Sequence, residues 1–153
     1  MTITYRSATP ADLPTLLQFE QGIITTERPF DPNLKPDPIS YYDIAAMIPN
    51  PDIEVMVATN GTEVVGSAYV KIVETKSYFK FDKYAFLGFM FVKAEFRGKG
   101  ISQAILERAK EWAKAQNLSE LRLEVYDENV RAVRAYEKAG FSKRMVEMRC
   151  EVK

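Results

Sequence analysis

The chain has 153 residues, a length typical of one domain, and its 21 basic residues balance 21 acidic ones. With 46% hydrophobic and 27% charged residues it has the composition of a globular protein, and the charge balance gives no reason to expect a nucleic-acid or membrane partner. Histidine is absent, which excludes histidine-based catalytic triads and histidine-ligated metal sites. Because Cys150 is the only cysteine and no apolar run approaches a signal peptide or membrane span, we expect a cytoplasmic domain over residues 1–153, without disulfide or metal.

The N-terminal third predicts a strand and two helices joined by a long irregular segment. Residues 3–5 alternate between apolar and polar side chains, as in a short strand. Thr9-Pro10-Ala11-Asp12 has the spacing of a helix start, and leucines carry that helix to about residue 20. Repeated prolines in residues 22–38 argue against a helix there, and a loop of this length is usually functional or mobile. Residues 41–48 suggest a second, short helix.

The middle of the chain predicts antiparallel strands. Asn60-Gly61 lies between two β-rich runs, residues 54–59 and 62–74, and indicates a two-residue hairpin turn because both residues tolerate positive φ. Residues 84–92 are almost unbroken apolar sequence, which is typical of a central strand buried on both faces.

The C-terminal third predicts alternating helices and strands. A helix with one apolar face begins near Ile101, residues 121–126 alternate as a strand, and residues 129–139 form a further helix. Residues 141–153 are expected to form a last strand, or two strands broken by a bend. This order of elements predicts an α/β fold with a central mixed sheet, partly antiparallel and partly parallel, flanked by helices.

The loop after the apolar strand carries the main chemical signal. It brings two glycines and two cations, in Arg97-Gly98-Lys99-Gly100, to the start of the helix at Ile101. Glycines let the backbone approach an anion closely, and the free N–H groups of a first helical turn attract phosphate. The residues alone leave two interpretations open: a phosphate site, or a solvated turn with a glycine hinge. The glycine spacing matches neither the P-loop nor the dinucleotide fingerprint.

Three segments together resemble the GNAT superfamily of N-acetyltransferases. The loop Arg97-Gly98-Lys99-Gly100-Ile101-Ser102 is similar to the family's cofactor motif, Q/R-x-x-G-x-G/A, with Ser102 in place of the usual glycine or alanine. The segment from Asn129 through Tyr136 to Phe141 follows the family's second motif, and residues 6–13 are similar to its first strand and helix. The resemblance implies a GNAT-type acyl-CoA N-acyltransferase fold, and transfer of an acetyl group from acetyl-CoA to a primary amine by direct attack on the thioester.

The resemblance also implies roles for residues at the cofactor end. The pyrophosphate of acetyl-CoA would bind the glycine loop, and the pantetheine arm would pair with the strand before it. The cofactor-binding residues expected in this way are Met90, Phe91, Val92, Arg97, Gly98, Lys99, Gly100, Ile101, Ser102, Gln103 and Asn129. Backbone N–H groups at Phe91 or Val92 would stabilise the oxyanion. Tyr136, on the same helix face as Asn129, would protonate the departing thiolate, although a tyrosine taken alone is more commonly a core residue packed on the sheet.

The general base is left open by the sequence. Many family members carry an acid near positions 88 and 89, where this chain has Gly88 and Phe89. Glu124 has the position that the resemblance to ribosomal-protein N-terminal acetyltransferases gives to a base. A solvent-exposed glutamate and a water relay without a dedicated base are the two other interpretations. At the acceptor end, we expect Glu27 and Arg28 to bind the substrate, since they enter the proline-rich segment.

Other functions and partners stay open at this stage. The alternative from another class is a non-catalytic acyl-CoA-binding regulatory module on the same fold, and a third is a domain that binds a different nucleotide. Aromatic residues at 41–42 and 78–81 would either wall an acceptor pocket or pack on the surface. The acceptor, a small molecule or a peptide amine, is not named by the sequence. An exposed strand edge would favour a homodimer.

Overall fold

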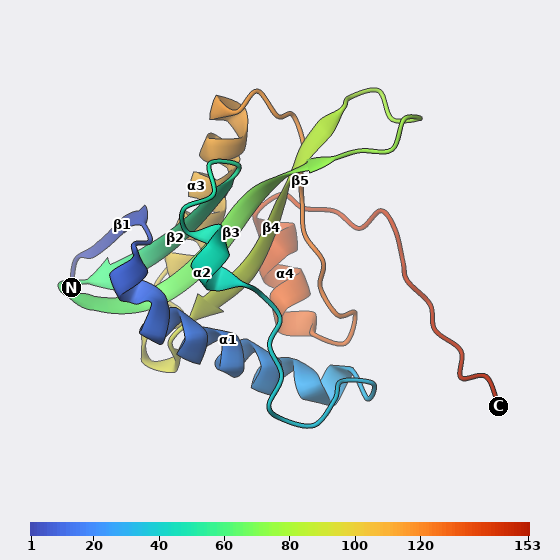
Figure 1. Cartoon of the computed structure of the whole chain (residues 1–153), viewed down its shortest axis with the longest axis horizontal. Coiled ribbons are helices and arrows are strands. Elements are labelled where there is room, and N and C mark those ends of the chain that lie inside the picture. Colours follow the sequence, from blue (N-terminus) through green and yellow to red (C-terminus); the bar gives the residue numbers. More distant parts are fainter.

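Five strands form one mixed sheet in the order β1-β2-β3-β4-β5 in the computed structural model, which describes residues 1–153. The pairings β1–β2, β2–β3 and β3–β4 are antiparallel, and the pairing of β4 with β5 is parallel (Figure 1). Their bounds are β1 Ile3–Ser7, β2 Ile53–Asn60, β3 Glu63–Glu74, β4 Lys83–Val92 and β5 Leu121–Arg122. The predicted α/β fold with a mixed sheet is confirmed, and the turn between β2 and β3 has its positive φ, 62°, at Gly61.

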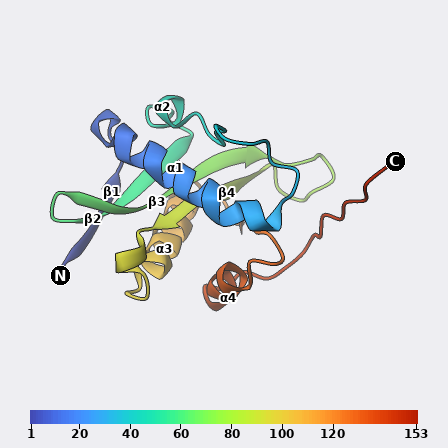
Figure 2. The same ribbon diagram turned by 90° about the horizontal axis from the view of Figure 1, so that it is seen from below.

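Helices cover both faces of the sheet. The four α-helices are α1 Leu13–Glu27, α2 Ile44–Met47, α3 Ile101–Ala115 and α4 Val130–Lys138, and short 3₁₀ turns span Pro10–Asp12, Arg28–Phe30 and Ala94–Phe96. Seen along the sheet, α1 and α2 lie on one side and α3 and α4 on the other (Figure 2). None of these helices has the length and apolarity needed to cross a bilayer.

Each face of the sheet has its own core, and β4 contributes to both. Ala85 and Leu87 pack with Ile105 of α3, whereas Phe89 packs with Phe19 of α1. Side chains two apart along a strand normally face the same side, so the change between Leu87 and Phe89 needs an irregularity. The pairing of β3 with β4 slips by one residue at this point, which is a β-bulge.

The helix α1 is longer than the sequence predicts. It continues through Gly22 to Glu27, although residues from 22 onward were expected to be irregular. A Cβ at Gly22 would lie 2.7 Å from the Phe91 ring, so the glycine lets the helix pass close over β4 rather than ending it. Tertiary packing here outweighs the low helix propensity of glycine, about 1 kcal/mol against alanine.

The predictions for the last strands are wrong. The strand expected over residues 121–126 is only Leu121–Arg122, and residues 141–153 form no strand. These last residues run away from the sheet as an extended chain (Figure 1). Alternating apolar residues form a strand only when an edge accepts them, and β5 is too short to offer a long edge. Met145 and Met148 are accordingly about nine-tenths exposed, at 90% and 89%.

Candidate active site

The strands β4 and β5 diverge soon after they meet. Their pairing is limited to Ala85 with Leu121 and Phe86 with Arg122, next to a hydrogen bond from the Ala85 amide to the Glu120 carbonyl, 2.9 Å. From Leu87 to Val92 the edge of β4 therefore has no strand beside it. The divergence leaves backbone N–H and C=O groups available on a buried central strand, which is unusual because such groups are normally paired.

The bulge determines which of these backbone groups face the opening. Phe89 has a left-handed φ of 58°, a strained conformation for a bulky residue, and its carbonyl accepts a hydrogen bond from Ser67 Oγ at 3.1 Å. The Lys93 amide donates to the Val65 carbonyl at 2.9 Å on the β3 side. Bonds along an antiparallel ladder alternate, so Phe91 pairs with Ser67 while the Val92 amide faces the opening.

The glycine loop joins this edge to α3. Gly98 and Gly100 have left-handed φ values of 73° and 82°, and a Cβ at either would meet nothing within 4 Å, so both lie beside open space. The first intrahelical bond runs from the Ala104 amide to the Gly100 carbonyl, 3.0 Å. The amides of Ile101, Ser102 and Gln103 thus have no intrahelical acceptor. Free amides, a positive helix end and the exposed side chains of Arg97 and Lys99 make a site for an anion.

Three side chains predicted to bind cofactor are engaged within the protein. Arg97 Nε donates to the Val92 carbonyl at 3.1 Å and closes the loop onto the end of β4. Gln103 Nε2 donates to the Ala135 carbonyl at 3.1 Å and ties α3 to α4. Asn129 caps α4, since its Oδ1 accepts from the Ala132 amide at 3.3 Å. The structure therefore gives Gln103 and Asn129 a positioning role, in which they fix α4 beside the loop.

Tyr136 lies on the half-buried face of α4. Its ring packs edge-on against Phe141, with centroids 6.0 Å apart, and its hydroxyl makes no hydrogen bond to another protein atom. Burial, with a contribution from the negative charge of Glu27, raises the pKa of Tyr136 to about 12. The phenol therefore stays protonated throughout the physiological range and is able to donate a hydrogen bond to negative charge that develops beside it.

Glu124 follows β5 and is exposed. It makes no hydrogen bond or ion pair, and its charge acts on Tyr69, whose pKa is raised by burial and then by Glu124. Tyr69 also explains the missing acid on β4. A Cβ at Gly88 would lie 2.5 Å from the Tyr69 hydroxyl, so the tyrosine ring occupies the space that an acidic side chain at position 88 would need.

The two residues predicted to bind the acceptor differ in their surroundings. Arg28 is held in the proline-rich segment, where it donates to the Lys35 carbonyl at 2.8 Å and pairs with Asp37 at 2.6 Å. Glu27 ends α1, is half-buried and forms no ion pair, and the Tyr41 hydroxyl is the side-chain group that interacts with its carboxylate. Burial raises the pKa of Glu27, the interaction with the Tyr41 hydroxyl lowers it in part, and the charge of Asp31 raises it further.

Sequence reasoning missed what two buried acids do in this region. Asp31 accepts from the Tyr126 hydroxyl at 2.6 Å and pairs with Arg149 at 2.9 Å, which joins the proline-rich segment to the chain before α4 and to the C-terminal segment. Glu20 accepts from the amides of Tyr41 and Tyr42, at 2.8 and 2.7 Å, and so fastens that segment to α1. For Glu20 the available signal was an acid on the apolar face of a helix, which is costly unless paired, whereas Asp31 carried no such signal.

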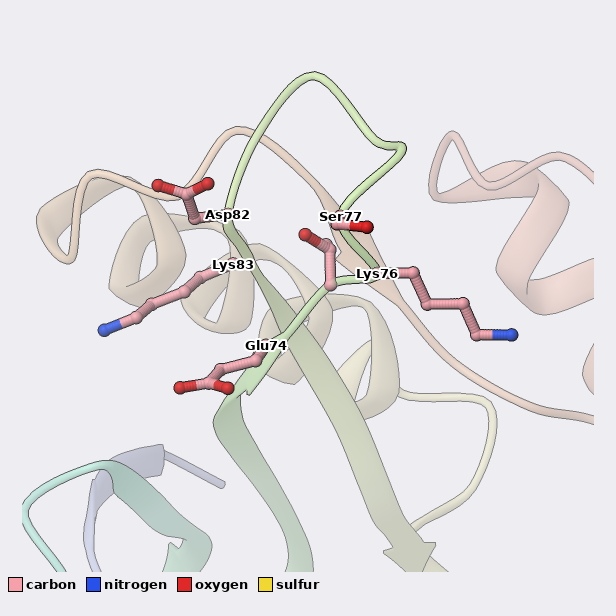
Figure 3. Close-up of a pocket in the computed structure, with 6 residues that line it drawn as sticks. Glu74, Lys76, Ser77, Asp82 and Lys83 are labelled. Carbon is pink, nitrogen blue, oxygen red and sulfur yellow. The ribbon is translucent and has the colours of Figure 1, made fainter.

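The aromatic residues at 78–81 lie apart from Tyr41 and Tyr42, the other aromatic residues considered for an acceptor pocket. They lie at the tip of the β3–β4 hairpin, where Tyr78 is 74% exposed. A hollow of about 230 Å³ beside them is lined only by polar residues, and its two lysines, Lys76 and Lys83, point in opposite directions (Figure 3). Enclosed apolar surface and convergent polar groups are typical of ligand sites, and this hollow has neither.

Comparison with known proteins bears on this geometry. Residues 21–141 match the model of the "Acetyltransferase (GNAT) family". The chain belongs to this family. The sequence prediction of a GNAT acetyltransferase is thereby confirmed. The matched residues include the diverging strands β4 and β5 and the glycine loop between β4 and α3.

Individual relatives are similar over different lengths. A streptothricin acetyltransferase from Escherichia coli is 44% identical over 46 residues, which is 30% of this chain and only 26% of that enzyme. A putative acetyltransferase from Agrobacterium tumefaciens has 25% identity and a TM-score of 0.75, covering 97% of this chain and 99% of the other. A predicted acetyltransferase from Clostridium acetobutylicum, solved with acetyl-CoA, has 19% identity and a TM-score of 0.75 over 98% of this chain and 96% of its own.

Proposed function

We propose that residues 1–153 act as one acetyltransferase domain that transfers an acetyl group from acetyl-CoA to a primary amine by direct attack on the thioester. The observation that carries the proposal is the glycine loop, with its free helix amides, placed directly after an unpaired edge of β4 in a chain of the GNAT family. The solved relative with acetyl-CoA supports the choice of acetyl donor.

The chain's own groups fit acetyl-CoA in two places. The amides at the start of α3, with the charges of Arg97 and Lys99, would hold the pyrophosphate. The free edge of β4 would pair with the amide groups of the pantetheine arm, as a neighbouring strand does. Acetyl-CoA, when bound, supplies the activated acetyl group and the thiolate leaving group.

Two groups of the chain would act on the reaction itself. The Val92 amide, which faces the opening, would donate a hydrogen bond to the acetyl oxygen as negative charge develops there. Tyr136 would give its phenolic proton to the sulfur as the carbon–sulfur bond breaks. Its pKa of about 12 means that the phenol carries its proton before the reaction begins.

Several parts of the function stay proposals or predictions. The acceptor is proposed to be an amine, and the partial match to a streptothricin acetyltransferase makes streptothricin the first acceptor to try. The cytoplasmic location and the homodimer stay predictions. The non-catalytic acyl-CoA-binding module remains the alternative function, since Gly88 and Phe89 stand where acids often occur.

A charge placed in the loop tests the cofactor site. We expect Gly100→Glu to abolish acetyl-CoA binding in calorimetric titration, because a carboxylate would lie beside the free helix amides and repel the pyrophosphate. Gly61→Glu is the matched control: Gly61 also has a left-handed φ, 62° against 82°, and open space around a Cβ, but lies in the β2–β3 turn. It should bind acetyl-CoA like the unmodified chain, and equal binding by Gly100→Glu would refute the site.

Release of CoA separates the enzyme from the binding module. The unmodified chain is incubated with acetyl-CoA and a panel of primary amines that includes streptothricin, and free thiol is measured. Turnover with any amine supports the transferase. Tight acetyl-CoA binding without thiol release across the panel would favour the regulatory module.

A further inference from the structure

We propose that Glu27, at the C-terminal end of α1, binds the ammonium group of the acceptor and takes its proton, so that the acceptor is a cationic amine. The inference rests on the proposed function and deepens it. From the sequence, the base was either Glu124 or a water relay, and Glu27 was expected only to bind the substrate. The proposal gives the role of base to Glu27.

The fold brings Glu27 to the acceptor side of the opening. In both views the C-terminal end of α1 lies beside α4, the helix that carries Tyr136 (Figures 1 and 2). The Tyr126 hydroxyl bonds Asp31 just beyond that end, at 2.6 Å, and fixes the start of the α4 connection there. The Tyr42 ring contacts Phe89 at the bulge, with centroids 5.3 Å apart, and connects the same region to β4.

The groups around Glu27 are phenols and one further acid. The negative charge of Glu27 raises the pKa of four tyrosines that lie on the three segments packed around it, and Asp31 in turn raises the pKa of Glu27; these groups are Tyr41, Tyr42, Tyr126, Tyr136 and Asp31. The cation in this neighbourhood, Arg149, is paired with Asp31 and Glu147 at 2.9 and 2.8 Å. Arg28 is paired with Asp37 in the proline-rich segment.

Glu27 is thus a half-buried carboxylate that no cation of the chain neutralises. Half-buried acids are normally paired, because burial disfavours the charged form. The buried Tyr41 hydroxyl interacts with the Glu27 carboxylate, whose pKa it lowers, but no protein atom lies in good hydrogen-bond geometry to it, and a phenol brings no positive charge. An ammonium group would supply the missing positive charge, and as a compact cation with three N–H donors it would bond both the carboxylate and the phenol oxygen. The tyrosine rings would contact the carbon atoms next to it and attract the cation through their faces.

The same carboxylate is suited to take a proton. Burial raises its pKa toward the operating range, where a base is most effective. Glu27 would accept a proton from the ammonium, and the neutral nitrogen would form a bond to the acetyl carbon. The carbon–sulfur bond would break, the sulfur would take the Tyr136 proton, and the nitrogen would return its second proton to the tyrosinate through water. The products are the acetamide, CoA thiol and one proton, which leaves Glu27 for solvent.

Glu124 lacks these features. It is exposed to solvent, and the phenol on which its charge acts is Tyr69, which the β3–β4 face buries at 5% exposure. An exposed carboxylate is hydrated, and hydration weakens its hold on an ammonium group.

The test compares pH profiles of kcat/KM for the unmodified chain and Glu27→Gln, with streptothricin and with fluorinated and unfluorinated ethylamines as acceptors. We expect Glu27→Gln to lower kcat/KM about 100-fold or more near neutral pH. Without the base, only amine that is already neutral reacts. The kcat/KM of Glu27→Gln should therefore rise about tenfold per pH unit up to each amine's own pKa. The unmodified chain should instead be level between the pKa of Glu27 and that of the amine.

Three controls keep the outcomes separate. Glu137→Gln removes a charge from an exposed position on α4 and should leave the profile unchanged. Glu27→Asp keeps the carboxylate and should restore part of the level region. Calorimetric titration with acetyl-CoA shows whether each variant is folded. If the unmodified chain binds no acetyl-CoA, the proposed function fails and this inference with it. If it transfers acetyl groups and Glu27→Gln has the same profile, the proposed function stands and Glu27 is not the base.

Discussion

At the scale of single residues, the phenol of Tyr136 is the group whose role the structure constrains most. Its hydroxyl has no hydrogen-bond partner in the protein, and its pKa is raised to about 12. We expect Tyr136→Phe to lower turnover about 100-fold, the effect of removing a general acid, and to leave acetyl-CoA affinity nearly unchanged. Steady-state kinetics and calorimetry measure the two quantities. Tyr5→Phe is the control, because Tyr5 is another half-buried tyrosine with a raised pKa, but on β1. Unaltered turnover in Tyr136→Phe would refute the acid assignment.

The sequence predicted some of these residues well because their roles depend on local patterns. The glycines at 98 and 100 follow a strand and begin a helix, and Tyr136 has a fixed spacing from Asn129. Glu27 carries no such pattern. Its importance comes from tyrosines 14 or more residues away in the chain, and from the absence of a pairing cation, which only the folded structure reveals. The glycine at position 88 likewise has no explanation in the local sequence, because the space for a side chain there is taken by Tyr69 on the neighbouring strand.

At the scale of elements, the pairing of β3 with β4 shapes the opening, and the absence of a side chain at Gly88 leaves room for the Tyr69 ring in that pairing. We expect Gly88→Ala to destabilise the fold by about 1–3 kcal/mol, the usual cost of overpacking, because its Cβ would lie 2.5 Å from the Tyr69 ring carbon Cζ. Chemical denaturation of Gly88→Ala, Tyr69→Leu and the double variant measures this. The double variant should be more stable than the sum of the single effects predicts, and strict additivity would contradict the contact.

Elements with strong local signals were predicted, and those that depend on partners were not. The hairpin at Gly61, the apolar β4 and the helices α3 and α4 all occur close to their predicted bounds. By contrast, β5 and the expected C-terminal strand needed an edge to pair with, and alternation cannot report whether that edge exists. The bulge at Phe89 likewise has no signal in the sequence, since a phenylalanine with a φ of 58° is held there by tertiary contacts.

At the scale of the whole molecule, acids with opposite pKa shifts set how stability depends on pH. Hydrogen bonds from Arg6 lower the pKa of Asp12, and those from Tyr126 and Asn33 lower that of Asp31. An acid with a depressed folded pKa stabilises the fold above its unfolded value, about 3.9, and this stability is lost as the pH falls through the folded pKa. The effect of Glu27 on the pH dependence of stability has the opposite sign, because the pKa of Glu27 is raised in the folded state.

The raised pKa of Glu27 predicts a stability cost for the proposed site. Between its unfolded value, about 4.3, and its folded value, the folded chain binds more protons than the unfolded one, so stability falls as the pH rises through that window. The loss persists at neutral pH, where Glu27→Gln removes it. We expect this variant to have a higher Tm than the unmodified chain at pH 7, with the difference disappearing near pH 4, as measured by calorimetric melting across that range. Glu137→Gln, at an exposed position, should shift neither. A lower Tm for Glu27→Gln at pH 7 would mean that a cation of the chain neutralises Glu27. A higher Tm together with lost turnover would show that the chain gives up stability in order to hold a binding group without its partner.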